Sequence, residues 1–176
     1  MDVRWVIGGT LIAILLLSFT GHVLIFSNMR VLDFAHRELS YRSLANRLTD
    51  ATDPATITRD TIKFVSRNVF LPSNTPVIDD DPWDVLLRGN GYCDQMNQLA
   101  AALLEKQGIT AHWTALRKAS GDEPHAVLEV LRGDRWEVFD PLFDTLLLTP
   151  TGNVATISEI CADPSIITNN SYFRAT

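Results

Sequence analysis

The chain has 176 residues, enough for one ordinary domain and a short appendage, and its 46% hydrophobic and 20% charged residues exclude intrinsic disorder. Its formal net charge is −6 and it has no run of Lys or Arg, so nothing favours binding to a nucleic-acid backbone. We therefore expect one folded domain and no nucleic-acid partner.

The N-terminal segment is apolar. From Trp5 to Phe26 there are 22 residues without Asp, Glu, Lys or Arg. As a helix this segment is about 33 Å long, which is enough to cross a bilayer. A cleaved secretion signal is the alternative, but the run is longer than a usual signal core and no clear cleavage site follows it. The sequence predicts a single-pass transmembrane anchor over residues 1–27.

The charges that flank this segment bear on its orientation. Arg30, Arg37, Arg42 and Arg47 follow the span, whereas only Arg4 precedes it. The positive-inside rule therefore favours a cytoplasmic domain, but long C-terminal domains can be translocated regardless of flanking charge. The side of the membrane stays open.

Residues 28–52 are predicted to be a juxtamembrane segment. Apolar residues recur at helical spacing from Val31 to Leu48, between polar and basic residues, which is typical of an amphipathic helix. We interpret the apolar face as packing on the domain, with a partner-binding face as the alternative. The domain itself is predicted to cover residues 53–176.

The first half of this domain has a helical pattern. Helices are expected to start near Thr56 or Thr58, at Pro82 and at Cys93, the last of them running to Gln107 before Gly108. Asp79, Asp80 and Asp81 precede the second helix, and we interpret them as solvated charges near a helix start rather than as a cation site.

The second half has a strand pattern. Consecutive antiparallel strands are expected over residues 109–116, 125–131 and 135–139, with a Gly133-Asp134 turn between the last two. A strand-like stretch over 146–148 and a short helix near 158–162 complete the domain. Helices followed by strands indicate an α+β fold.

Three residues in this framework suggest thiol chemistry. Cys93 opens a helix, where unpaired amides and the helix dipole stabilise a thiolate and can also bind an oxyanion. His125 starts a strand and can act as the base, and Asp140 ends the next strand, so a tight hairpin brings the two together. Each residue alone is more often a packing, capping or turn residue, but the ordered set predicts a catalytic triad.

The remaining cysteine, Cys161, is interpreted as structural. A disulfide with Cys93 stays open from sequence alone, although it would disable the nucleophile. A metal site at Cys93, His125 and Asp140 is not expected, because the thiol has no neighbouring ligand pair. We expect neither a metal nor an organic cofactor.

These residues resemble the transglutaminase-like superfamily. The resemblance covers roughly residues 80–145, and its most specific parts are Gly91-Tyr92-Cys93, His125-Ala126 with Glu129-Val130, and Trp136 with Asp140-Pro141. It implies a papain-like core in which the nucleophile helix packs on an antiparallel sheet. It carries over Cys93 as nucleophile, His125 as base and Asp140 as the orienting carboxylate.

The other matched residues and the departures concern the walls of the site. We interpret Trp136 as core packing and Glu129 as a strand-face residue with local bonds. An arginine common in the family is replaced here by the region of His112-Trp113. No side-chain oxyanion donor is assigned; Trp83 and Tyr92 are candidates.

A second resemblance is to the arylamine N-acetyltransferases, through the segment from Arg88 to Asn97. That family is longer and soluble, and the segment from Trp136 to Pro141 fits it poorly, so we keep it as a minor alternative.

The expected function is that of a membrane-anchored thiol hydrolase or acyltransferase. Its substrate is expected to be a protein, a peptide or another amide-containing molecule near the membrane, with a membrane protein complex as a further partner. The rival from another class is a catalytically silent scaffold subunit of a membrane assembly.

Overall fold

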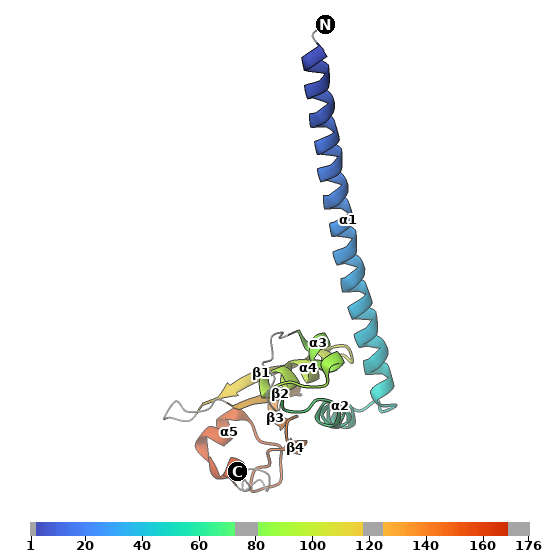
Figure 1. Cartoon of the computed structure of the whole chain (residues 1–176). Coiled ribbons are helices and arrows are strands. Elements are labelled where there is room, and N and C mark those ends of the chain that lie inside the picture. Colours follow the sequence, from blue (N-terminus) through green and yellow to red (C-terminus); the bar gives the residue numbers. More distant parts are fainter. Residues whose placement is uncertain (1–2, 73–80, 118–124, 169–176) are drawn as a thin grey trace. The chain divides into compact units, whose positions relative to one another are not determined.

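The computed structural model describes residues 3–72, 81–117 and 125–168. The chain divides between Ser40 and Tyr41 into two units. The first unit belongs to helix α1 (Val3–Leu48), which is continuous in Figure 1. From Ile14 this helix is long and apolar enough to cross a membrane, with a mean hydropathy of 1.5 in its most apolar window and none of that window buried. The predicted amphipathic segment thus continues the apolar helix without a break.

The apolar face predicted from Val31 to Leu48 falls partly in each of the two units. Tyr41, Leu44 and Leu48, in the last turns of α1, pack against the core of the second unit. Val31 and Phe34, in contrast, are 64% and 70% exposed. The packing expected of this face on the domain is present in its C-terminal turns.

The second unit begins with this end of α1 and continues with three helices: α2 (Pro54–Asn68), α3 (Pro82–Arg88) and α4 (Cys93–Glu105). Helix α2 starts a few residues before the predicted threonines, because the carboxylate of Asp53 accepts a hydrogen bond from the backbone N–H of Thr56 at 2.9 Å and Pro54 occupies the first turn. Asp81 caps α3 in the same way through the N–H of Trp83, whereas Asp79 and Asp80 lie outside the described residues.

The sheet has four antiparallel strands in the order β1 (Ala111–Leu116), β2 (His125–Arg132), β3 (Arg135–Asp140) and β4 (Thr145–Leu146). Arg132 pairs with Arg135, so Gly133 and Asp134 form a tight turn, and Gly133 has the positive φ of 61° that such a turn favours. The predicted α+β class and the three longer strands are confirmed.

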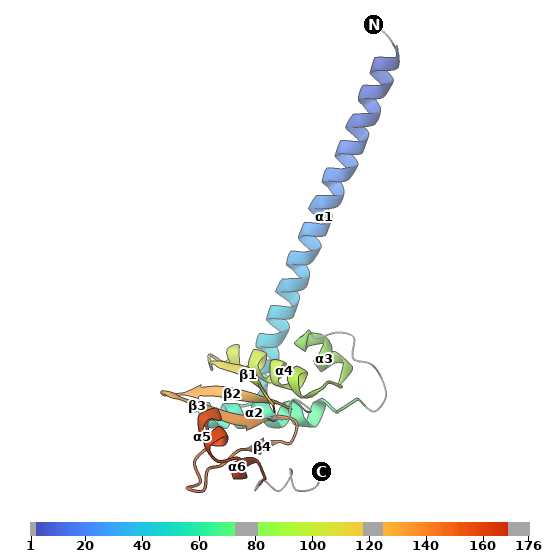
Figure 2. The ribbon, with the colours of Figure 1, turned by 90° about the vertical axis from the view of Figure 1, so that its left-hand side faces the viewer.

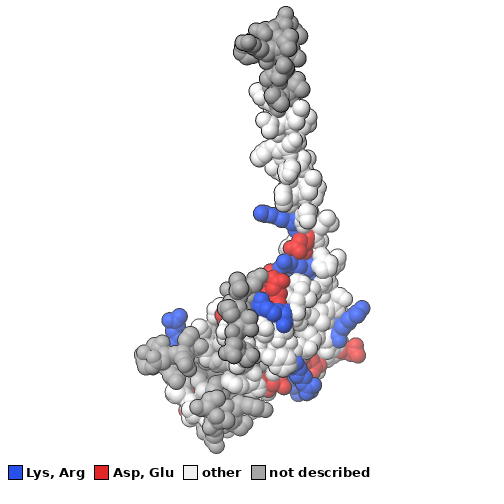
Figure 3. Space-filling model, in the orientation of Figure 1, with Lys and Arg blue, Asp and Glu red and all other residues white. Residues whose placement is uncertain are grey.

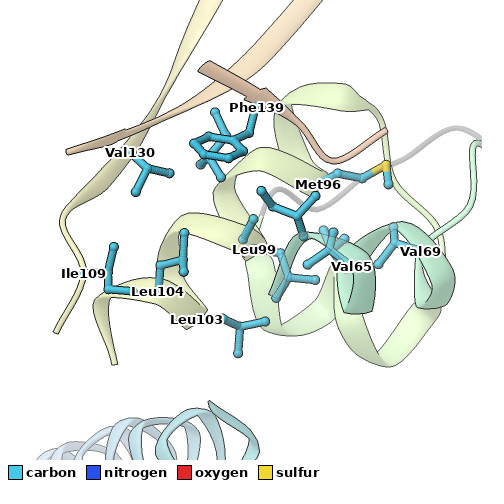
Figure 4. Packing of buried hydrophobic residues seen from close by; sticks show 13 residues of the cluster. Val65, Val69, Met96, Leu99, Leu103, Leu104, Ile109, Val130 and Phe139 are labelled. Carbon is cyan, nitrogen blue, oxygen red and sulfur yellow. The ribbon is translucent and has the colours of Figure 1, made fainter. Parts of the chain in front are cut away.

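The two faces of the sheet are covered by different helices. On one face, α2 and α4 enclose a core with β2 and β3, shown in Figure 4; its labelled members are Val65, Val69, Met96, Leu99, Leu103, Leu104, Ile109, Val130 and Phe139. On the other face, shown in Figure 2, lie α5 (Ile157–Ala162) and α6 (Ser165–Thr168). Val127 and Val138 pack there with Ile160 and Ile166. Alternate residues of β2 thus enter two cores, which fixes the strand between helix layers.

Candidate active site

Cys93 is the first residue of α4, directly after the loop Gly89–Tyr92. Gly89 ends α3 with a left-handed φ of 69°. A Cβ on Gly91 would lie 3.0 Å from Val85 Cγ1 and 3.2 Å from Gln95 Oε1, so only glycine fits there without a shift. The same Gln95 oxygen accepts a hydrogen bond from the N–H of Tyr92 at 3.0 Å. The loop is therefore held closely against the helix that carries the thiol.

His125 and Asp140 come from the two strands of one hairpin. His125 is the first residue of β2 and Asp140 the last of β3. His125 Nε2 lies 2.6 Å from Oδ2 of Asp140, whose side chain is fully buried. The other carboxylate oxygen accepts a hydrogen bond from the N–H of Leu142 at 3.0 Å. Both oxygens of Asp140 are thus engaged, and the imidazole has a fixed orientation.

The thiol of Cys93 faces this imidazole, and the two are hydrogen-bonded. Because Asp140 engages Nε2, the second ring nitrogen is available to the sulfur. The backbone of Ala126 also contributes a hydrogen bond to the sulfur. The structure therefore brings the three sequence-predicted residues together in the order thiol, imidazole, carboxylate.

The two titrating groups have displaced pKa values. Burial favours the neutral forms of both, but hydrogen bonds and the charge of His125 outweigh it, so the pKa of Cys93 is lowered. For His125, burial is opposed by the hydrogen bond and charge of Asp140 and by Cys93, which raise its pKa to about 9. These directions favour a thiolate paired with an imidazolium near neutral pH.

Asn97, which sequence reasoning missed, connects the nucleophile helix to the histidine strand. Its fully buried side-chain amide donates to the carbonyl oxygen of Cys93 at 2.6 Å and to that of Ala126 at 2.9 Å. Facing two carbonyls fixes which end of the amide is nitrogen. Asn97 Oδ1 is buried and accepts no hydrogen bond from a described residue. The sequence feature that could have pointed to Asn97 is its position one helical turn after Cys93, on the same face of α4.

Two aromatic residues lie beside the site. Tyr92 precedes the nucleophile and is 47% exposed. The ring of Phe143 is centred 5.8 Å from that of His125. Trp83, the other proposed oxyanion donor, packs edge-on against Tyr41 at 5.1 Å. The first turn of α4 offers the N–H groups of Cys93 and Asp94, which have no intrahelical acceptor.

Glu129 and Trp136 lie further along the sheet. Glu129 Oε2 accepts a hydrogen bond from Thr114 Oγ1 at 2.5 Å and lies 3.2 Å from Nε2 of His112. The ring of His112 is centred 4.4 Å from that of Trp136. The local bonding expected of Glu129 is present.

Cys161 differs from the expectation of a structural residue, because it is exposed on α5 rather than packed. Both cysteines are free thiols. Within residues 3–72, 81–117 and 125–168, no group of three or more His, Cys, Asp or Glu residues is arranged to hold a metal ion.

Comparison with known proteins identifies the family. The sequence pattern of the transglutaminase-like superfamily matches residues 42–141, which is more than half of the chain and includes Cys93, His125 and Asp140. The chain belongs to the transglutaminase-like superfamily. This agrees with the first of the two resemblances. A comparison with curated protein sequences finds no match.

Solved structures show the fold. A candidate cysteine protease from Cytophaga hutchinsonii is similar at a TM-score of 0.54 and 18% identity, over 72% of this chain and 44% of that one. The periplasmic domain of TgpA from Pseudomonas aeruginosa is similar at a TM-score of 0.48 and 19% identity, over 60% of this chain and 42% of that one. A TGase is similar at a TM-score of 0.47 and 17% identity, over 69% of this chain and 36% of that one. The chain spans less than half the length of each, and the first likeness establishes a shared fold.

Proposed function

We propose that this protein is a membrane-anchored thiol enzyme that acts on amide or ester bonds through a Cys93 thioester. The observation that carries the proposal is the contact of a helix-start thiol with an imidazole whose far nitrogen is 2.6 Å from a buried carboxylate. The lowered pKa of Cys93 and the raised pKa of His125 support the same roles.

The first half of the reaction forms a thioester. The Cys93 thiolate attacks the substrate carbonyl carbon, a carbon–sulfur bond forms, and the carbonyl electrons move to oxygen. The first-turn amides of α4 are placed to stabilise this oxyanion. His125 then gives its proton to the leaving nitrogen or oxygen as that bond breaks. Asp140 stabilises the imidazolium and keeps the ring in position.

The second half of the reaction regenerates the free enzyme. Water or an amine attacks the thioester carbon while His125 takes its proton, and the carbon–sulfur bond breaks to regenerate the thiolate. Attack by water gives hydrolysis, and attack by an amine gives transfer or crosslinking. Incubating a protein substrate with and without a fluorescent primary amine distinguishes the two reactions.

The anchor is part of the proposal. The exposed apolar stretch of α1 is suited to a single crossing of the bilayer, which would hold the domain near amide-containing substrates or a protein complex at the membrane. Resistance to carbonate extraction, with the N-terminus still detectable by mass spectrometry, separates an anchor from a cleaved signal. A C-terminal alkaline-phosphatase fusion and a fluorescent-protein fusion determine the side.

The first experiment measures the rate of iodoacetamide alkylation of Cys93 against pH in the full chain in neutral detergent. Mass spectrometry of the peptides separates Cys93 from the exposed Cys161, which serves as an internal reference. We expect a midpoint for Cys93 below the free-cysteine value of about 8.5, and a return toward that value in His125→Ala. An inert Cys93, or a midpoint indifferent to His125→Ala, contradicts the enzyme and favours the silent scaffold.

A further inference from the structure

Helix α2 presents three cations on one exposed face. Arg59, Lys63 and Arg67 follow one another at four-residue spacing. None of them forms an ion pair with a described residue, and the polar contact of Arg59 is a hydrogen bond to Thr56 Oγ1 at 3.3 Å. In Figure 3, Lys and Arg atoms lie on the lower right of the domain, over α2 and the end of α1, with some Asp and Glu atoms between them. The cations thus remain available to a ligand.

These cations line one wall of a groove of about 340 Å³. We name it the basic groove; its lining residues are Arg59, Ile62, Lys63, Arg67, Asp144, Thr145 and Leu146. Its second wall is the turn from β3 into β4. The groove therefore combines cations with the apolar side chains of Ile62 and Leu146 and with one carboxylate.

Each wall of the basic groove is connected along the chain to a segment of the candidate active site. After α2, Phe70 receives the N–H of Gly91 on its carbonyl oxygen at 3.0 Å and donates its own N–H to Gly89 at 3.0 Å, in the loop that precedes Cys93. On the other wall, Asp144 directly follows Phe143, whose ring lies against His125. Both walls are thus joined through short segments to residues beside the thiol and the imidazole, which suits a substrate chain that also reaches Cys93.

The spacing of the cations suits an extended chain. Four residues of an α-helix rise about 6 Å, and alternate residues of an extended chain are about 6.6 Å apart. Successive cations therefore match every second side chain of a strand-like ligand. We propose that the basic groove binds an extended acidic segment of the substrate, with Asp or Glu at alternate positions. This inference rests on the proposed function, because it makes the bound molecule the substrate.

A peptide suits the groove better than the other anionic surface near a membrane protein, a layer of acidic lipid headgroups. The cations form one wall of a concave site, which a narrow extended chain can enter but a flat layer of headgroups cannot follow. The net charge of −6 also opposes a general attraction to polyanions, so that recognition depends on local contacts.

Binding to the full-length Cys93→Ala protein tests this inference independently of catalysis. The probe is a fluorescein-labelled heptapeptide with Glu at every second position and Ala elsewhere, and its control is the isomer with the Glu residues contiguous. We expect fluorescence anisotropy to show tighter binding of the alternating peptide, by roughly threefold or more, and weaker binding at higher salt. Equal binding of the two isomers overturns the spacing argument.

Variants locate the contact. Replacing Arg59, Lys63 and Arg67 together by Gln is expected to lower the affinity for the alternating peptide by roughly tenfold or more. Each exposed ion pair contributes about threefold to the affinity. Lys106→Gln, at the end of α4, is the matched control and should leave binding unchanged. Asp144→Asn should tighten binding by roughly twofold; Asn tolerates the φ of 49° found there, so this variant tests the groove even if the triple variant fails to fold.

A second readout follows Lys63 itself. The alternating peptide is expected to protect Lys63, but not Lys106, from acetylation. Unchanged affinity in the triple variant or in Asp144→Asn overturns the inference, as does protection of Lys63 by phosphatidylglycerol vesicles but not by the peptide. Failure of the proposed function would instead appear as an ordinary Cys93 in the alkylation experiment, with peptide binding intact.

Discussion

The buried carboxylate of Asp140 lies 2.6 Å from the imidazole of His125, and this pair couples the chemistry of the site to the stability of the domain. Asp140 receives the N–H of Leu142 on its other oxygen, so the ring is oriented by a group that the fold itself holds. Changes at this pair should therefore alter both thiol reactivity and the free energy of unfolding.

The first prediction concerns pH. The pKa of His125 is raised to about 9 from an ordinary value near 6.5, so its stabilising contribution is complete below about 6.5 and is lost as the pH rises through about 9. The lowered pKa of Cys93 acts in the opposite sense. Urea unfolding should show a net fall in the free energy of unfolding of roughly 1 to 3 kcal/mol between pH of about 6 and about 10.

The variant Asp140→Asn should flatten that profile, because the raised pKa of His125 depends on the Asp140 charge. Asp134→Asn removes an exposed carboxylate in the hairpin turn and should leave the wild-type profile unchanged. A similar fall in both variants would mean that another group titrates in this range.

The second prediction concerns Asn97. Asn97→Ala leaves the carbonyls of Cys93 and Ala126 without their buried donor and should lower the free energy of unfolding by about 2 to 3 kcal/mol. Because Ala126 also contributes a backbone hydrogen bond to the thiol, the alkylation midpoint of Cys93 should rise. Gln98→Ala, at the next position of α4, should change stability by no more than about 0.5 kcal/mol. If destabilisation occurs with an unchanged midpoint, Asn97 supports the fold without positioning the site.

The third prediction tests the core beneath the site. Leu99 is fully buried between α2, α4 and the sheet, so Leu99→Ala should cost about 2 to 5 kcal/mol in urea unfolding. Leu39→Ala makes the same change at a position 68% exposed on α1 and should have little effect on the unfolding of the second unit. Comparable losses from both would contradict the packing described for α4.

The fourth prediction separates two glycines. In Gly91→Ala the new methyl meets Val85 and Gln95, so the loop before Cys93 must shift and alkylation of Cys93 should slow. Gly108→Ala has open space but a φ of 75°, so it should cost about 1 kcal/mol of stability and leave the thiol midpoint unchanged. An unaltered alkylation profile in Gly91→Ala would show that the loop can move without displacing the sulfur.

Local sequence signals predicted the main parts of the site for physical reasons. Gly89 and Gly91 marked a break immediately before an apolar helix, which placed Cys93 at a helix start. The Gly133-Asp134 turn fixed the pairing of its two strands, and this brought the start of β2 beside the end of β3. The helix start and the hairpin turn depend on residues that are close in sequence, so both can be predicted from a single sequence.

Long-range contacts were not predictable in the same way. The residues around Asn97 in the sequence do not indicate that its amide reaches the carbonyl of Ala126, which lies on β2. The start of α2 depended on whether Asp53 or a later threonine provided the cap, and both choices are chemically sound. The packing of Leu44, near the end of α1, depends on where the domain begins, and helical spacing alone does not mark that point.

The pairing of Arg132 with Arg135 sets the register of the hairpin, and this register can be measured through the reactivity of Cys93. A slip of one residue in this hairpin would turn every side chain of β3 to the opposite face of the sheet and carry the carboxylate of Asp140 away from the imidazole. A misregistered chain would then retain much of its secondary structure but lose the reactive sulfur. The fraction of Cys93 whose alkylation midpoint lies below the free-cysteine value therefore measures the fraction of molecules with the correct hairpin register, which circular dichroism cannot provide.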